Sequence, residues 1–296
     1  MDLDGKALAE KIRLRHAAEV EALNRAGRSP RLVHVQVGRG DAADAYVRGQ
    51  RRGAEAWGVG YEIQSLPADA SEADVSAALR RASADPAATG VLLQLPLPPH
   101  LPTRALQRCI SPQKDVEGVH PENLGHIVHG GPGLAPCTAL AVLELLESSG
   151  APIRGAEAVV VGHSDIVGKP VALLLLAREA TVTVCHKFTK DLASHTRRAD
   201  LLVVAVGRPG LVTADHVRAG AVVVDVGINA VPDPAAKGGT RLVGDVDYAA
   251  LTAKGCRVTP VPGGVGPVTV AMLMRNTVLA ASRMTAGAGP EAPRLD

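Results

Sequence analysis

Apolar residues form two kinds of pattern in the first part of the chain. Short runs rich in valine and leucine have the length and composition of buried strands, and they lie at Leu32–Val37, Val59–Leu66 and Val91–Leu95. Segments with the apolar spacing of helices precede or separate these runs, at about 3–26, 43–57 and 72–82. Strands and helices that alternate in this order predict parallel β-α-β units and therefore a first α/β domain.

A second alternating series follows a loop-rich segment at 111–136 and a helix at Thr138–Ser149. Its strands are nearly continuous in apolarity, as strands covered on both faces are, and are expected at Ala158–Val161, Thr181–Cys185, Leu201–Val206 and Ala221–Val226. Its helices are expected near Gly168–Arg178 and Leu192–Arg197. This series predicts a Rossmann-like domain.

The predicted fold class is therefore α/β with two domains. The first domain is expected to span 1–137 and to be completed by residues 270–285. These belong to a C-terminal helix that is expected from about Pro267 to Met284 and returns to this domain. The Rossmann-like domain is expected to span 138–269. The remaining tail, 286–296, has the composition of a disordered segment.

Composition narrows the classes of partner. The chain has 32 Lys and Arg against 30 Asp and Glu, and aromatic residues make up only 2%, so nucleic acid is an unexpected partner. The charged N-terminus has no apolar signal segment, and no apolar run is long enough to cross a bilayer, which predicts a soluble, cytoplasmic protein. The four widely spaced cysteines contain no C-x-x-C pair, so reduced thiols are expected.

A small-residue turn between a strand and a helix is the first candidate site. Val159–Pro170 reads VVVGHSDIVGKP, and such a turn directs backbone N–H groups and a helix N-terminus at a phosphate. Ser164 stands where a second glycine of the dinucleotide motif is usual, so the motif is weak without its strand-helix context. The cofactor contacts expected here are Gly162, His163, Ser164, Ile166 and Val167. For His163, an exposed turn position is an equal alternative.

The identity of the nucleotide is predicted from the end of the next strand. An NAD enzyme places an acidic residue there, whereas this chain reads CHKFTK, in which His186 precedes Lys187 and Lys190 follows. Two lysines attract a 2′-phosphate, so NADP is favoured over NAD, and a solvated basic loop is the alternative. Later strand ends should line the same crevice, through Val206, Gly207, Asp225, Gly227 and Ile228.

A glycine- and proline-rich loop, Val261–Val270, precedes the final helix. In its sequence, VPGGVGPVTV, the prolines stiffen the backbone and the glycines carry no side chain. The loop can therefore approach a flat ligand closely. The expected contacts are Pro262, Gly263 and Gly264 for the substrate, and Gly266 and Thr269 for the cofactor.

Several motifs in order resemble one family over nearly the whole chain. They are LLQLPLP at 92–98, KDVEGVHPEN at 114–123, PCT at 136–138, GHSDIVGKP at 162–170, DVGIN at 225–229, VGDV at 243–246 and PVPGGVGPVTVAML at 260–273. The chain is identified by them as similar to the methylenetetrahydrofolate dehydrogenase/cyclohydrolase family. The resemblance implies a homodimer with a folate cleft between two domains. It also implies hydride transfer from methylenetetrahydrofolate to NADP+, followed by hydrolysis of the methenyl cation.

The resemblance also carries over individual residues. Tyr46 matches the tyrosine that stacks against folate, and Gln94 matches the glutamine beside the catalytic base, with Leu95 and Pro96 following it as substrate contacts. The family's lysine, four residues after the tyrosine, is Gln50 in this chain. The adjacent arginines at 51 and 52 point about a hundred degrees or more away on a helix and are no simple substitutes.

Two further departures accompany Gln50. Ala43 stands where the family usually has serine, and Glu117 replaces the aspartate that holds the pterin edge. Glu117 either changes the fit of the folate or is absorbed by a small backbone movement. Together with Ala43, it keeps open an oxidoreductase acting on another cyclic aminal or imine.

The lysine's absence separates the two reactions. Hydride transfer requires placement, whereas hydrolysis requires a titratable side chain, which a neutral amide does not supply. The sequence therefore predicts a dehydrogenase with cyclohydrolase activity lost or severely weakened. The alternatives are a bifunctional enzyme with a substitute proton relay and a catalytically silent binding homologue. No metal site is expected, because His120, His126 and His129 lie in a segment expected to be a glycine-rich loop, with no helix to fix the geometry of a ligand set.

Overall fold

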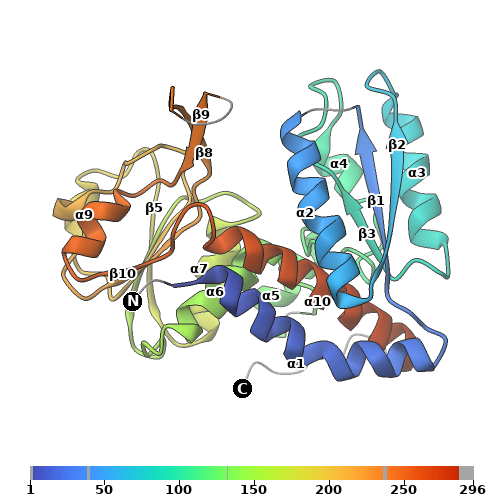
Figure 1. The fold of residues 1–296 in the computed structure, drawn as a ribbon, viewed down its shortest axis with the longest axis horizontal. Coiled ribbons are helices and arrows are strands. Elements are labelled where there is room, and N and C mark those ends of the chain that lie inside the picture. The colour runs from blue at the N-terminus through green and yellow to red at the C-terminus, as the bar shows by residue number, and fades with distance from the viewer. Residues whose placement is uncertain (1–2, 39–40, 132, 236–238, 287–296) are drawn as a thin grey trace. The chain divides into compact units, whose positions relative to one another are not determined.

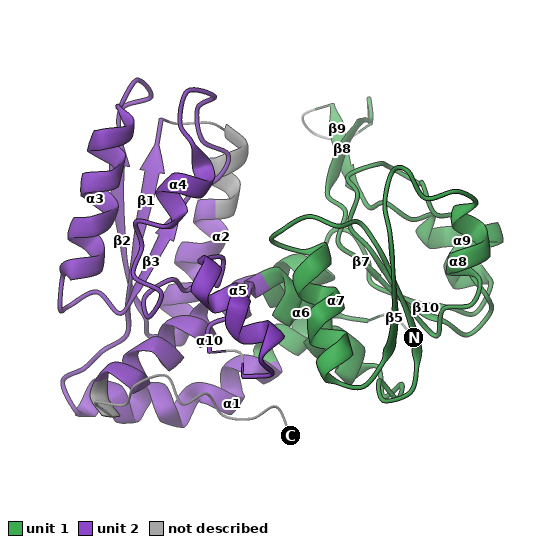
Figure 2. Ribbon diagram, turned by 180° about the vertical axis from the view of Figure 1, so that it is seen from behind, with its two compact units in different colours: residues 1–10, 138–269 green, residues 11–137, 270–296 purple. Residues whose placement is uncertain are grey.

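The computed structural model describes residues 3–38, 41–131, 133–235 and 239–286, and within these ranges it leaves the side chains of 41–46, 285 and 286 undescribed. The chain divides into two compact units (Figure 2). Unit 1 comprises residues 1–10 and 138–269, and unit 2 comprises residues 11–137 and 270–296. Within the described ranges, no helix combines the length and the apolarity that crossing a membrane requires.

Unit 2 contains a three-stranded parallel sheet in the order β2-β1-β3 (Figure 1). The strands are β1 (Arg31–Val37), β2 (Gly60–Leu66) and β3 (Gly90–Leu93). His34 of the central strand pairs with Ile63 on one side and with Leu92 on the other. Because the strands are parallel, their carboxyl ends meet at a single edge of the sheet.

The two faces of this sheet have different chemistry because side chains alternate along β1. Val33 and Val35 pack into an apolar core against α3 (Glu72–Ala84) and the segment of α4 (Thr103–Gln107). His34 lies on the opposite face and contacts α2 (Asp41–Trp57). A polar residue in the middle of a buried strand therefore faces a helix.

Three further helices complete unit 2 (Figure 1). They are α1 (Gly5–Arg25), which begins in unit 1, α5 (Pro121–Val128), and most of α10 (Val265–Ala286). In α10, Asn276 is fully buried and its Nδ2 donates to the carbonyls of Val116 (2.9 Å) and Ala135 (3.0 Å). These two bonds fix the segment that follows β3 to the C-terminal helix.

Unit 1 is a doubly wound five-stranded parallel sheet in the order β10-β7-β6-β4-β5. The strands are β4 (Glu157–Val161), β5 (Thr181–Cys185), β6 (Leu201–Val204), β7 (Val222–Asp225) and β10 (Arg257–Val258). Helices α6 (Cys137–Ser148) and α7 (Gly168–Ala177) lie on one face, and α8 (Leu192–Thr196) and α9 (Tyr248–Ala253) on the other (Figure 2). The chain changes direction across the sheet between β4 and β6, which is where such sheets bind nucleotides.

The α/β fold class predicted from the apolar pattern is confirmed, but several shorter elements were not predicted. Helix α5 lies in the segment expected to be loop, and the antiparallel pair β8 (Asn229–Pro232) and β9 (Thr240–Val243) projects from unit 1 (Figure 1). Residues 1–10 belong to unit 1 and not to the first predicted domain, because the N–H of Leu3 donates to the Val258 carbonyl and Gly5 packs on Gly264. The predicted disorder of 286–296 lies almost wholly outside the described residues.

Candidate functional site

The side chain of Gln50 is completely buried between α2 and the sheet of unit 2. Its Oε1 accepts a hydrogen bond from the Tyr61 hydroxyl (2.9 Å) and lies 3.1 Å from His34 Nδ1. Tyr61 Oη and His34 Nδ1 are themselves 2.5 Å apart. His34, Gln50 and Tyr61, from β1, α2 and β2, therefore form one hydrogen-bonded group, which we call the amide cluster.

The amide cluster is electrically neutral at physiological pH. Burial lowers the pKa of His34 to about 4, more than the hydrogen bond to Gln50 raises it. The imidazole is therefore uncharged at pH 7, beside an amide and a phenol hydroxyl. His34 therefore does not change its charge near neutral pH.

Two nitrogen atoms of the amide cluster have no hydrogen-bond partner. They are Gln50 Nε2 and His34 Nε2, and both are buried. An unpaired buried polar group typically costs about 1–3 kcal/mol, so such groups in a folded protein call for an explanation.

Gln94 follows β3 on the face of the sheet that carries His34. Leu92 pairs with His34, and Gln94 is two residues further along, so strand alternation directs both to the same face. Gln94 Nε2 donates to the Leu95 carbonyl (2.5 Å), while its Oε1 is buried without a partner. Leu95 is half-buried and Pro96 is exposed in the loop that follows.

The other α2 positions singled out in the sequence are either exposed or have undescribed side chains. Tyr46 and Ala43 lie in α2, but their side chains are outside the described set. Tyr46 precedes Gln50 by four residues and therefore shares its helix face. Arg51 and Arg52 are exposed, and neither takes part in the amide cluster.

Glu117, unlike the amide of Gln50, has a side chain that can gain and lose a proton. Its carboxyl is half-buried, and desolvation together with the nearby Asp115 carboxylate raises its pKa to about 8. Asp115 is fully buried, and its Oδ2 accepts bonds from the His120 N–H (2.7 Å) and Asn123 Nδ2 (2.9 Å). Glu117 therefore carries a proton through most of the neutral range.

The backbone around Glu117 is held firmly. Residue 115 forms a parallel bridge with Val91 of β3, which places this segment along the edge of the sheet. The Glu117 carbonyl accepts from the Cys137 N–H (3.3 Å). Gly118 has φ +70° and packs against Ala135 so closely that a Cβ would lie 2.2 Å from that residue's carbonyl carbon. Glycine at 118 is thus required by both conformation and contact.

The turn after β4 has the close packing of a phosphate-binding turn. Gly162 has φ +122°, and a Cβ there would lie 2.3 Å from the Ala205 carbonyl oxygen at the end of β6. At Gly168, the first residue of α7, a Cβ would lie 2.1 Å from the Gly162 oxygen. Ser164 Oγ accepts from the Gly168 N–H (3.4 Å), which links the turn to the first residue of α7. Only glycines permit so tight an entry into the helix.

Basic and aromatic side chains gather at the ends of β4 and β5. The rings of His163 and His186 are 5.1 Å apart, and both side chains are exposed. The Lys187 ammonium lies 4.9 Å from the centre of the exposed Phe188 ring, and Lys190 is also exposed. This loop presents cations at the place where a ribose 2′-phosphate lies in Rossmann-like domains.

Asp225, predicted to contact the cofactor, is buried at the end of β7. Its carboxylate accepts from the N–H groups of Gly227 (2.9 Å), Asp245 (2.9 Å) and Val246 (3.0 Å). Its own N–H donates to Thr259 Oγ1 (2.8 Å). The carboxylate thus braces the loop after β7, and a direct contact with cofactor stays a prediction.

Asp245 performs the same task for the loop after β6. Its Oδ2 accepts from the N–H groups of Val206 (2.7 Å) and Gly207 (2.9 Å), and its Oδ1 accepts from Asn229 (2.9 Å). The apolar side chains at this edge are left open: Ile166 is 42% exposed and Ile228 is 67% exposed. A flat apolar ring can be covered by such groups.

In the loop before α10, Pro262 is exposed and Gly263 has φ +109°. A Cβ on Gly264 would lie 2.6 Å from the Pro260 carbonyl oxygen, whereas one on Gly266 would meet nothing within 4 Å. Thr269 is buried, and its hydroxyl bonds to the Val265 carbonyl (3.1 Å). Gly263 and Gly266 therefore leave backbone open, while Thr269 serves its own helix.

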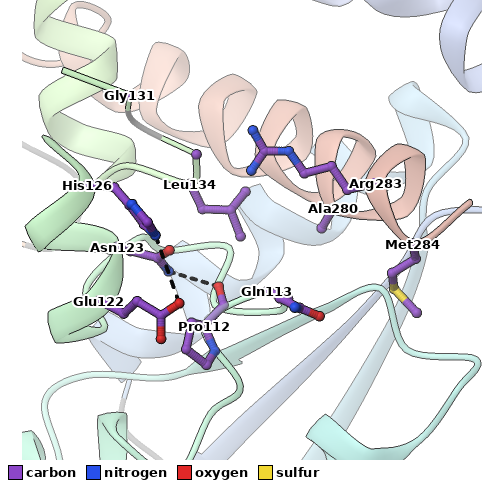
Figure 3. A pocket seen from close by; sticks show the side chains of 11 residues that line it. Pro112, Gln113, Glu122, Asn123, His126, Gly131, Leu134, Ala280, Arg283 and Met284 are labelled. Atoms are coloured by element: carbon purple, nitrogen blue, oxygen red, sulfur yellow. Dashed lines mark hydrogen bonds and ion pairs between the residues drawn. The ribbon is translucent and has the colours of Figure 1, made fainter. Parts of the chain in front are cut away.

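A separate hollow of about 170 Å³ in unit 2 lies between α5 and the end of α10 (Figure 3). Glu122, His126 and Arg283 line it, and the first two are 3.9 Å apart. None of the described lining residues is a serine, threonine, cysteine, tyrosine or lysine. Among the described residues, no three His, Cys, Asp or Glu side chains are grouped to hold a metal.

Three residues of the site were not predicted from the sequence. His34 and Tyr61 stand inside strands and match no motif, and only the polarity of His34 amid apolar neighbours gave a signal. Asp245 lies in the VGDV motif, which marked the segment but not the task of the carboxylate.

Known proteins resemble this chain over almost its full length. Residues 3–117 match the family model for the tetrahydrofolate dehydrogenase/cyclohydrolase catalytic domain, and residues 136–285 match the model for the NAD(P)-binding domain of the same family. The bifunctional protein FolD of Bordetella avium is 49% identical over 281 residues, covering 95% of this chain and 97% of that protein.

Solved structures give the same result. The Campylobacter jejuni bifunctional FolD enzyme matches with a TM-score of 0.91 and 39% identity, covering 96% of this chain and 99% of that one. The Trypanosoma brucei methylenetetrahydrofolate dehydrogenase-cyclohydrolase, solved with NADP and an inhibitor, has a TM-score of 0.91 and 40% identity, covering 97% and 99% of the two chains. As its motifs predicted, the chain belongs to the tetrahydrofolate dehydrogenase/cyclohydrolase family.

Proposed function

We propose that this protein is an NADP-dependent methylenetetrahydrofolate dehydrogenase whose methenyltetrahydrofolate cyclohydrolase step is lost or severely weakened. Family membership and the NAD(P)-binding domain match support the dehydrogenase. The observation that carries the loss of the second step is the burial of Gln50 in a neutral amide cluster. We further propose a cytoplasmic homodimer, as the family resemblance implies.

The nucleotide fits unit 1 by the chemistry of its strand ends. Gly162 and Gly168 permit the tight turn into α7 at the switch point between β4 and β6, and Lys187 and Lys190 offer cations to a 2′-phosphate. Bound NADP+ would supply the hydride acceptor. The chain's task in that step is to hold the folate and the nicotinamide in contact and to exclude water, which requires no proton transfer.

Hydrolysis requires more from the protein. Water must lose a proton as it attacks the methenyl carbon, and a ring nitrogen must gain one as the ring opens. The family's lysine can take part in such transfers, but the Gln50 amide cannot, and His34 beside it is neutral with a pKa of about 4. Loss of a general acid or base costs about 10²–10⁴-fold in rate.

A second candidate, a fully bifunctional enzyme, is favoured by Glu117. Its pKa of about 8 makes it the type of group that exchanges a proton close to neutral pH. Its carboxyl carbon chain is one methylene longer than that of the aspartate usual in the family. If Glu117 replaces the lysine's chemistry, hydrolysis persists and depends on this one carboxyl.

The experiment supplies methenyltetrahydrofolate directly and compares its decay with and without the protein. Decay at the buffer rate supports a dehydrogenase without cyclohydrolase activity. Enzyme-dependent decay far above that rate contradicts it. In that case, loss of the activity in Glu117→Gln, but not in the exposed-carboxylate control Glu55→Gln, identifies Glu117 as the substitute group.

A further inference from the structure

The amide cluster brings together three side chains that no motif connects. His34, Gln50 and Tyr61 come from three different elements, and their polar atoms lie within 3.1 Å of one another. Both His34 and Gln50 are 0% exposed. Residue 50 is therefore held by partners that would remain if it alone were changed.

We infer that His34 and Tyr61 are positioning residues that hold the side chain at position 50 by its polar end. Restoring a lysine there without changing them will therefore not restore hydrolysis. The inference rests on the proposed loss of cyclohydrolase activity and identifies why that loss is not a single-residue event.

The hydrogen bonds show which end of the Gln50 amide is engaged by its partners. The Gln50 carbonyl oxygen can only accept, and the Tyr61 hydroxyl donates to it. Tyr61 Oη, which lies 2.5 Å from His34 Nδ1, can at the same time accept from the Nδ1–H of that ring. In this arrangement the carbonyl end of Gln50 is engaged and its Nε2 is left without a partner.

A lysine at position 50 meets the same two partners. Its ammonium has three donors, Tyr61 Oη accepts one, and the other imidazole tautomer presents the Nδ1 lone pair to a second. Each hydrogen bond to a charged group is worth on the order of tenfold in an equilibrium. Withdrawing the ammonium from both partners toward a substrate is then disfavoured about a hundredfold.

His34 does not itself take over the proton transfer. Its pKa of about 4 makes it a weak base, and its second nitrogen, Nε2, is buried without a partner to relay a proton. The polar atom facing its Nδ1 from α2 is that of Gln50, and from β2 that of Tyr61. His34 therefore orients the side chain at position 50 and does not transfer a proton.

The test compares Gln50→Lys with the triple variant Gln50→Lys/His34→Val/Tyr61→Phe, with His34→Val/Tyr61→Phe as the matched control. Valine suits the strand, as Val33 and Val35 do, and phenylalanine keeps the ring of Tyr61. Each variant's fold is checked by thermal melting and by NADP+ binding, which belongs to unit 1. The readout is the decay of methenyltetrahydrofolate above the buffer rate.

We expect no gain in Gln50→Lys or in the control, and at least a tenfold gain in the triple variant. An equal gain in Gln50→Lys overturns the inference, and so does a folded triple variant without any gain. If the triple variant does not fold, Gln50→Lys/Tyr61→Phe replaces it and must exceed Gln50→Lys. Hydrolysis by the unaltered protein would instead contradict the proposed function.

Discussion

Gln50 and Glu117 lie in the same unit, and only Glu117 has a side chain that can gain and lose a proton. Gln50 is an amide inside a neutral cluster, whereas burial and Asp115 give Glu117 a pKa of about 8. The proposed loss of hydrolysis therefore rests on which side chains titrate, and not on the fold.

The first residue-scale prediction concerns nucleotide choice. Lys187→Ala/Lys190→Ala should raise the KM for NADP+ about 10–100-fold and leave the KM for NAD+ nearly unchanged, because charge-assisted bonds to a 2′-phosphate are lost. The control, Arg154→Ala/Lys254→Ala, removes two cations that precede β4 and β10, at the opposite edge of the sheet. Equal increases in the KM values for both nucleotides would show that these lysines do not bind the 2′-phosphate.

The second residue-scale prediction concerns pH and stability. In the folded protein, the pKa of Glu117 is raised from 4.5 to about 8, so the folded state binds its proton more tightly than the unfolded state. Its contribution to the free energy of unfolding is therefore fully present below about pH 4.5 and is lost as the pH rises toward 8. Denaturation midpoints of the unaltered protein should therefore fall from pH 5 to pH 8 relative to those of Glu117→Gln. Parallel curves for the two proteins would contradict the raised pKa.

At the scale of elements, the entry into α7 depends on glycines that touch backbone. Gly168→Ala should destabilise unit 1 by roughly 1–3 kcal/mol and raise the KM for NADP+, because its Cβ would lie 2.1 Å from the Gly162 oxygen. Gly125→Ala in α5 is the control: its Cβ meets nothing within 4 Å, so stability should rise by about 0.5–1 kcal/mol. Melting curves and NADP+ titrations of both variants test this contrast.

Elements with a clear apolar pattern were predictable from the sequence. β1, β5 and α10 fall within a few residues of the expected bounds. Helix α5 has only eight residues and sits among glycines, and the exposed β8-β9 pair buries too little to leave a pattern. Short elements of this kind are set by tertiary contacts and not by local periodicity.

At the scale of the whole molecule, the order of motifs was enough to predict the two-unit α/β architecture and the family, and the comparisons confirm the family. The substitution at position 50 was also visible in the sequence. Its surroundings were not, because His34 and Tyr61 meet Gln50 only through the pairing of β1 with β2 and the packing of α2. Contacts between distant segments carry the functional detail that motifs omit.

The most direct test is one reaction of the purified protein with methylenetetrahydrofolate and NADP+, in which NADPH and methenyltetrahydrofolate are followed together. If hydride transfer is retained and hydrolysis is lost, as proposed, we expect the two products to rise in nearly equal amounts, after correction for decay in buffer. Steady NADPH formation with little accumulated methenyl product would contradict it, since the protein would then be hydrolysing the cation as fast as it forms.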